Sequence, residues 1–244
     1  MKKQYLKKFA FGLGVGIFSA IAQAFPVIQV SQESAAGVGD FGSNILGEIG
    51  AFETDLTASE YYQYGKPKKF SFNNNDFELV SNRSHVFFVN GADGLSLFTV
   101  QDRKFDKRGG FVNMTYALEG DAVDIKVKDD PSDKYTMFDS QTLNVKQKWH
   151  RKRTDGLVLG GLEDDWAMTI DFNNWSKNSI LDWFAYSSDN EAIELSLEKN
   201  RRIHLTIANI STPIEQVAEV PEPATIGMLA IGSAAGLIRR RRKV

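Results

Sequence analysis

Residues 112–128 read VNMTYALEGDAVDIKVK, and this stretch decides the fold class. Apolar side chains occupy every second position from Val112 to Leu118 and again from Val123 to Val127. Side chains at alternate positions point to the same face of an extended strand. Glu119, Gly120 and Asp121 between the two runs have the chemistry of a turn. The stretch therefore predicts two strands, each with one buried face.

The same alternation, or a short apolar run between turn residues, recurs along the chain. It is found at 69–72, 85–89, 95–99, 143–147, 157–159, 166–170, 193–197 and 203–207. Residues 90–94 and 129–133 are rich in Asn, Asp, Gly and Pro and read as turns. Long helical periodicity is absent, and only 44–64 has room for a short helix. About ten short strands predict an all-β fold with one antiparallel β-sandwich of jelly-roll type, with an up-and-down barrel as the alternative.

The N-terminus has the pattern of a secretory signal peptide. Four lysines precede an apolar run from Phe9 to Ala22, and small residues at Ala22 and Ala24 suit a signal peptidase. We therefore expect a signal peptide over 1–24 and an ectodomain over 25–210. The expected partners at this step are the export translocon and signal peptidase.

The C-terminus has three elements in order. Pro221, Glu222 and Pro223 precede an apolar segment at 224–238, and a cluster of arginines and one lysine follows at 239–243. The segment spans about 22 Å as a helix, which is short for a hydrocarbon core of about 30 Å. Residues 211–220 read as a spacer. Basic clusters outside both apolar segments predict that both termini stay in the cytoplasm and that the middle of the chain is exported.

This tail resembles the PEP-CTERM sorting signal of exported bacterial proteins. The resemblance is carried by Pro221, Glu222 and Pro223, by the transmembrane segment 224–238 and by the basic end of the chain. It implies that a membrane enzyme of the exosortase type processes the tail. It also implies a location at the cell surface or outside the cell, with exopolysaccharide or biofilm as the setting.

Charge and cysteine content exclude several classes of function. Without the four lysines of 1–24 and the five basic residues of 221–244, 20 of the 29 basic residues remain. Of the 31 acidic residues, 30 remain, so the body carries a net charge near −10. That charge argues against nucleic acid as a partner. The chain has no cysteine, which excludes disulfides, a thiol nucleophile and a cysteine zinc site.

No constellation of catalytic residues is recognisable. The three histidines, His85, His150 and His204, do not form a metal-binding spacing, and the chain has no Gly-x-Ser-x-Gly segment or phosphate-binding loop. We therefore predict no catalytic residue and no enzyme. A glycan-active hydrolase needs only two carboxylates, which the sequence cannot locate, and it stays open as an alternative.

Calcium is the one cofactor for which the chain offers candidates. Acidic loops beside strands supply oxygen ligands. The first predicted group is Asp121, Asp129, Asp130 and Asp133, and the second is Glu163, Asp164 and Asp165, to which Asp155 could be added.

Tryptophans and a basic run are the remaining candidates for a binding surface. Trp175 lies among polar turn-forming residues and is the predicted glycan contact, whereas alternation places Trp166 and Trp183 in the core. Residues 146–153 are locally basic and suit an anionic polysaccharide. The sequence thus favours a non-enzymatic exported surface or matrix protein, with a carbohydrate-binding module, dependent on calcium or not, as the alternative.

Overall fold

The computed structural model describes residues 26–65, 71–74, 76–163, 165–176, 182–188, 192–198 and 200–208. A compact unit ends at Ala208. The predicted signal peptide with Ala22 and Ala24, the spacer, and the tail with Pro221, Glu222, Pro223 and segment 224–238 lie outside the described residues. In the described part of the chain, no helix has the length and hydropathy needed to span a membrane.

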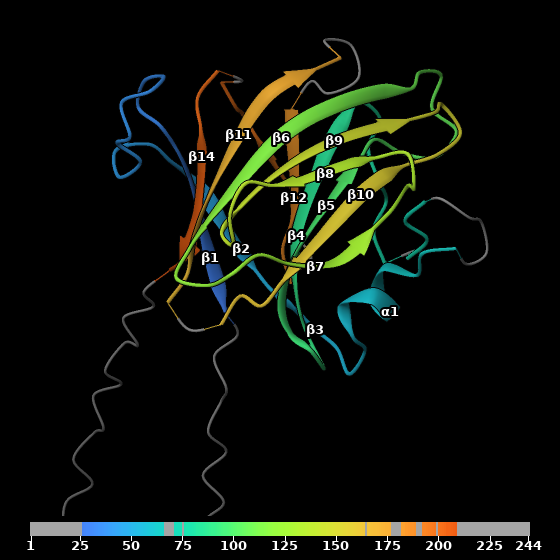
Figure 1. The fold of residues 1–244 in the computed structure, drawn as a ribbon, viewed down its shortest axis with the longest axis horizontal. Coiled ribbons are helices and arrows are strands. Elements are labelled where there is room, and N and C mark those ends of the chain that lie inside the picture. The colour runs from blue at the N-terminus through green and yellow to red at the C-terminus, as the bar shows by residue number, and fades with distance from the viewer. Residues whose placement is uncertain are drawn as a thin grey trace, which may run out of the picture. The chain divides into compact units, whose positions relative to one another are not determined.

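Fourteen strands and one short helix make up the described body (Figure 1). The first sheet, sheet A, has the order β2-β1-β14-β11-β6-β9-β8. Its strands are β1 (Val27–Gln32), β2 (Ile45–Gly50), β6 (Gly110–Glu119), β8 (Lys134–Met137), β9 (Thr142–Trp149), β11 (Ala167–Trp175) and β14 (Ile203–Ile207).

The second sheet, sheet B, has the order β13-β12-β4-β5-β10-β7, and β3 pairs with β4 beside this path. Its strands are β3 (Phe52–Glu53), β4 (Arg83–Gly91), β5 (Gly94–Gln101), β7 (Asp124–Lys128), β10 (Asp155–Gly160), β12 (Asp182–Tyr186) and β13 (Ala192–Leu195). Most pairs are antiparallel, as predicted. The prediction of a wholly antiparallel fold is wrong at β4, which pairs in parallel with both β3 and β12.

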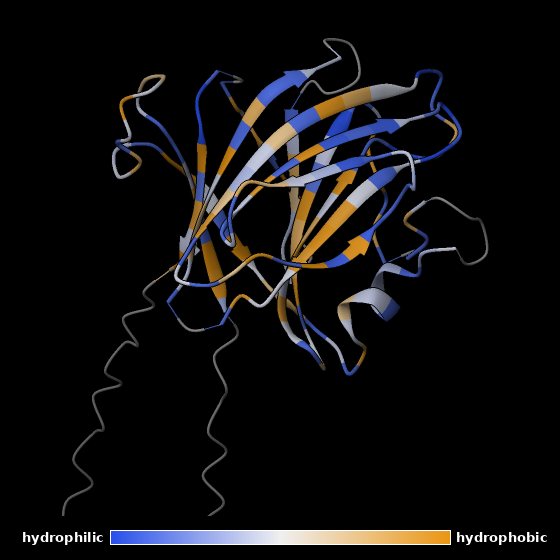
Figure 2. Ribbon diagram, viewed as in Figure 1, coloured by the Kyte–Doolittle hydropathy of each residue, from blue (hydrophilic) through white to orange (hydrophobic). Residues whose placement is uncertain are grey.

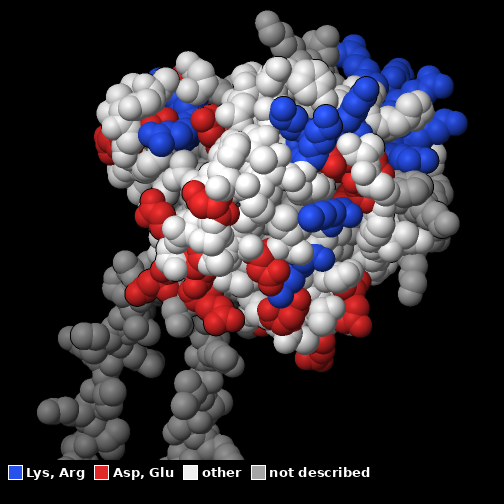
Figure 3. Space-filling view, in the orientation of Figure 1, with Lys and Arg blue, Asp and Glu red and all other residues white. Residues whose placement is uncertain are grey.

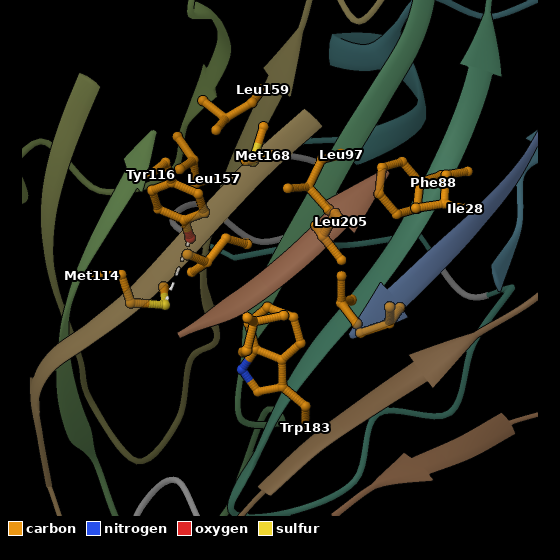
Figure 4. Packing of buried hydrophobic residues seen from close by; sticks show 14 of the residues in the cluster. Ile28, Phe88, Leu97, Met114, Tyr116, Leu157, Leu159, Met168, Trp183 and Leu205 are labelled. Carbon is orange, nitrogen blue, oxygen red and sulfur yellow. Dashed lines mark hydrogen bonds between the residues drawn. The ribbon is translucent and has the colours of Figure 1, made fainter. Parts of the chain in front are cut away.

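The two sheets are separate and enclose one hydrophobic core. Met114, Tyr116 and Leu205 of sheet A are buried in the same cluster as Phe88 and Leu97 of sheet B (Figure 4). The hydroxyl of Tyr116 donates to the sulfur of Met114 at 3.7 Å, so this buried polar group has a partner. Trp166 and Trp183 are 2% and 1% exposed, which confirms that they belong to the core.

The outer face of sheet B is covered. The helix α1 (Ala58–Tyr62) and the segment that follows it pack aromatic rings such as Tyr62 and Phe72 against Phe87 and Phe98 of that sheet. Strands β4 and β5 are therefore buried on both faces, which explains why they read as apolar runs (Figure 2). The helix begins at a capping box, because Thr57 and Glu60 satisfy each other's backbone amides.

The outer face of sheet A, by contrast, carries polar side chains. Along β9, buried Leu143, Val145 and Gln147 alternate with the exposed Lys146 and Lys148. Strands β6 and β11 show the same alternation of buried and more exposed positions. In the described part of the chain, the outward side chains along β6, β9 and β11 are exposed or half-buried, and this part of the face positions the candidate site.

Strand predictions are confirmed where alternation is strong and wrong elsewhere. Nine predicted strands match β4 to β7, β9 to β11, β13 and β14, and the short helix is found within 44–64. Ser71 and Phe72 do not lie in a strand, so the prediction there is wrong, and residues 66–70 lie outside the described residues. The jelly-roll subclass stays a prediction.

Candidate functional site

Two basic loops meet at one end of sheet A. The first loop, 102–109, joins β5 to β6, and the second, 150–154, joins β9 to β10. Gly110 and Trp149 are register partners, so the loops lie side by side. A side chain at Gly109 would stand 2.5 Å from the carbonyl oxygen of Trp149, which explains why this position has none. We call these two loops the basic end.

Asp102 anchors the first loop. Asp102 is fully buried. Its Oδ1 accepts a hydrogen bond from the amide of Asn82 at 2.9 Å, and its Oδ2 accepts one from the indole of Trp149 at 3.0 Å. Its φ of +62° reverses the chain immediately after β5. The bond from Trp149 also links β9 to the first loop, so the two loops share one support.

Exposed cations cover the basic end, as the blue atoms at the upper right of Figure 3 show. The exposed ones are Arg153 and five others: Arg103, Lys107, Arg108, Arg151 and Lys152. Within the described residues, none of these five forms an ion pair, whereas Arg83, Lys126, Arg201 and Arg202 all do.

Three lysines continue the positive surface onto sheet A. Lys146 of β9 lies opposite Lys134 of β8 and opposite Asn113 of β6, and Lys148 lies two residues further along β9. We call Lys134, Lys146 and Lys148 the lysine row. A shallow hollow of about 350 Å³ lies here, lined by the lysine row with Phe111, Val112, Asn113, Ser132, Gln147 and Asn174.

The opposite end of sheet A is acidic. Register pairs place Ala167 beside Glu119, at the far end of β6 from Gly110. Asp121 follows the strand, and its carboxylate accepts a hydrogen bond from the amide of Glu163 at 3.2 Å. Acidic side chains accordingly gather along the lower side of Figure 3.

A cluster of carboxyl groups lies where the chain crosses between the sheets. β7 and β8 are the edge strands of sheets B and A, and the crossing segment 129–133 carries three aspartates. The Tyr62 hydroxyl donates to Asp129 Oδ2 at 2.6 Å, and the Tyr135 hydroxyl donates to Asp133 Oδ2 at 3.2 Å. Asp155, at the start of β10, accepts from Gln147 at 3.3 Å and from the amide of Gly156 at 2.8 Å.

Burial changes the acidity of this cluster. It raises the pKa of Asp129 to about 8, that of Asp133 to about 6 and that of Asp155 well above its usual range. Besides burial, the negative charge of the neighbouring Asp133 raises the pKa of Asp155. The cluster therefore holds protons at pH values where an exposed aspartate would be ionised.

An open hollow of about 400 Å³ borders the cluster. Its lining consists of Tyr64, Lys128, Asp129, Asp130, Pro131, Asp133 and Tyr135. The Lys128 ammonium lies 5.0 Å from the centre of the Tyr135 ring, so a cation already covers one aromatic face. Asp155 lies behind this surface and is not part of the lining.

The two predicted groups of calcium ligands are divided differently in the structure. Asp121 lies beside Glu163 at the acidic end, separated from Asp129 by the length of β7. Asp155 belongs to the cluster of carboxyl groups that contains Asp133, and not to the predicted group that contains Glu163. Asp165 is exposed close to Gly120, and Asp164 lies outside the described residues. Among the described residues, no three carboxylate or histidine side chains are arranged to hold a metal ion.

Trp175 differs from its expected setting. Residues 171–175 belong to strand β11, so the turn that the polar residues around Trp175 predict is wrong. The indole is half-buried against the core and lies edge-to-face with Phe172, with centroids 6.3 Å apart. A glycan contact through Trp175 stays a prediction.

His85 is a structural residue. It is fully buried, its Nε2 accepts from the amide of Val80 at 2.8 Å, and its Nδ1 lies 3.0 Å from the carbonyl oxygen of Val100. Nδ1 must therefore carry the proton. Burial lowers the pKa of His85 to about 4, so the ring stays neutral near pH 7.

Sequence reasoning missed several residues of both surfaces. The charges of Arg103, Lys107 and Arg108 were visible as a run, but only the fold brings them beside the second basic loop. Tyr62 of α1 reaches Asp129 across 67 residues, and the sequence carries no signal for this contact.

The described body is an all-β domain of two sheets, and the outer face of sheet A is positively charged at one end. Residues 219–243 match the family model of the PEP-CTERM protein-sorting motif. No curated protein and no solved structure matches the chain. The motif marks the chain as an exported protein that is anchored in the membrane and then processed by an exosortase, a membrane enzyme, before it reaches the surface.

Proposed function

We propose that the protein is a non-enzymatic component of the cell surface or extracellular matrix and that it associates with extracellular polysaccharide. The observation that carries this proposal is the open outer face of sheet A. The opposite sheet is covered by α1 and aromatic side chains, so sheet A supplies the strand surface that a long polymer can reach.

The chemistry of this face suits a sugar chain. Lys134, Lys146, Asn113 and Asn174 form one row across β8, β9, β6 and β11. Neighbouring strands lie about 4.8 Å apart, so the row presents donors over about 14 Å. Phe111 is 40% exposed beside them, and an exposed ring packs against the apolar face of a sugar.

Further polar groups extend the face away from the basic end. The Asn144 amide donates to Thr115 Oγ1 at 3.0 Å, and that hydroxyl donates to Asn173 Oδ1 at 2.8 Å. These side chains orient one another and keep donors and acceptors at fixed positions. A surface of this kind favours binding with little loss of side-chain entropy.

A polysaccharide pull-down with the full chain in neutral detergent tests the proposal. We expect wild type to be retained, and we expect Phe111→Ala with Asn113→Ala to weaken retention. Ile45→Ala with Val38→Ala removes exposed apolar side chains elsewhere and is the control. Parallel samples with calcium and with chelator address the calcium-dependent alternative. Absence of retention under all conditions would remove the proposed function.

A glycan-active hydrolase is the second candidate, because carboxyl groups with a raised pKa border an open hollow. The test is release of reducing ends from polysaccharide by wild type, by Asp133→Asn and by Asp121→Asn. Release that only Asp133→Asn abolishes would establish the enzyme and refute a purely structural role.

A further inference from the structure

The positive charge of the body is concentrated in one region. Residues 25–219 carry a net charge near −10. Yet half of their 20 basic residues belong to the basic end and the lysine row: Arg103, Lys104, Lys107, Arg108, Lys134, Lys146, Lys148, Arg151, Lys152 and Arg153. A charge separation of this kind produces a local positive potential that the net charge conceals.

The lysine row has an energetic cost in the isolated protein. Like charges directly opposite each other on neighbouring strands are destabilising, and Lys134 and Lys146 are such a pair. Lys148 adds a third charge on the same face. None of the three forms an ion pair with a described residue, whereas Lys126 on β7 pairs with Asp124 at 2.8 Å and Asp93 at 3.6 Å. An anionic ligand would relieve this repulsion.

The basic end lies opposite the point where the chain leaves the body. The amide of Ala208 donates to the carbonyl oxygen of Val27 at 2.8 Å, so the first and last described strands end together. Near this end of β14, Thr206 pairs with Ala167 of β11, and Ala167 pairs with Glu119 at the acidic end of β6. Gly110, at the basic end, is about 30 Å away along the strand.

We infer that the polysaccharide is an acidic one, whose carboxylate or sulfate groups bind the basic end and the lysine row. This inference rests on the proposed function and names its ligand class. The hollow places Phe111, Asn113 and Asn174 among the lysines, so it offers a ring and amides to sugar rings together with cations to their acidic groups. The acidic end repels the same polymer, which confines it to the half of the body farthest from the chain exit.

Binding of the full chain in neutral detergent to three immobilised polymers tests the inference: a polyuronate, a neutral glucan and double-stranded DNA. We expect tightest binding to the polyuronate, weakened about tenfold or more between 50 mM and 500 mM salt because exposed charges are screened. The triple variant Arg103→Gln, Arg151→Gln and Lys152→Gln should lose about tenfold at low salt.

The matched control replaces Arg83, Lys126 and Arg201 by Gln, because it changes the net charge equally at cations that already have partners. It should change affinity less than threefold, and thermal melts should show both variants folded. Equal binding of polyuronate and glucan, with no effect of the triple variant, would overturn the acidic ligand while leaving the proposed function intact. Preference for DNA would also overturn it. Absence of binding to both polysaccharides would remove the proposed function as well.

Discussion

Asp129 shows how one buried carboxyl group sets a pH dependence. It is fully buried, it accepts a hydrogen bond from Tyr62, and its pKa is raised to about 8. The folded protein therefore keeps a proton that the unfolded chain releases near pH 4. Such a group stabilises the fold fully below pH 4, and its contribution is lost as the pH rises toward 8.

Asp129→Asn should flatten this pH dependence. His85, with its pKa lowered to about 4, acts in the opposite direction up to about pH 6.5, so the informative window is pH 6.5 to 8. Between pH 6.5 and 8 we expect the ionisation of Asp129 to lower the free energy of unfolding of wild type by on the order of 2 kcal/mol. The variant has no carboxyl group to ionise there, so its free energy of unfolding should not show this decrease. Urea unfolding at both pH values measures it. If the free energy of unfolding decreases by the same amount in both proteins between pH 6.5 and 8, Asp129 is already ionised in the folded state.

Gly156 illustrates a position where a single methyl group matters. A Cβ there would stand 2.9 Å from the carbonyl oxygen of Thr99 and in collision with the Tyr62 hydroxyl. Gly156→Ala should therefore lower stability by about 1–3 kcal/mol, because strand β10 cannot move away from β5. Gly47→Ala is the control, since its nearest neighbour is Leu195 Cδ2 at 3.7 Å. Equal melting temperatures for both variants would contradict the packing described around Tyr62.

At the scale of elements, the ends of β1 and β14 are joined by Glu33. This carboxylate is buried and accepts from the amides of Gly39 at 2.9 Å and Arg202 at 3.0 Å, and from Arg202 Nε at 2.9 Å. These bonds, chiefly those from the guanidinium, lower the pKa of Glu33 to about 2. Its contribution to stability is therefore present above about pH 4.5 and is lost only as the pH falls toward 2.

Glu33→Gln should destabilise the protein by about 1–3 kcal/mol at pH 7, because a charged acceptor of several hydrogen bonds is replaced by a neutral one. Glu194→Gln removes an exposed partner of Arg83 and should cost less than about 1 kcal/mol. Chemical denaturation of the two variants compares them directly. If both cost the same, the link between β1 and β14 through Glu33 is unimportant.

Alternation of apolar and polar residues predicts a strand only where one face of the strand is buried and the other is exposed to solvent. β6, β9 and β11 follow this rule and were predicted. β8 was not, because this four-residue edge strand has no buried position to reveal it. The parallel pairing of β4 with β12 joins segments about 100 residues apart, and no local pattern encodes it.

At the scale of the whole molecule, sequence and fold contribute different parts of the site. The charged run 146–153 and the aspartates of 129–133 were recognisable from the sequence. Their surroundings depend on chain crossings: Gly110 pairs with Trp149, and Asp155 meets Asp133. Asp121 and Asp155 were consequently assigned to the wrong neighbours. The C-terminal motif was recognisable because its order along the chain is itself the signal.

Delivery to the surface is the central claim, and immunoblots of fractionated native cells test it most directly. The comparison is between the full chain and a variant with Pro221, Glu222 and Pro223 replaced by alanine. We predict that wild type is found outside the inner membrane and shortened by roughly the 25 residues of the motif, whereas the variant stays uncut in the membrane fraction. Unclipped wild-type protein in the cytosol, or identical processing of both chains, would contradict the account.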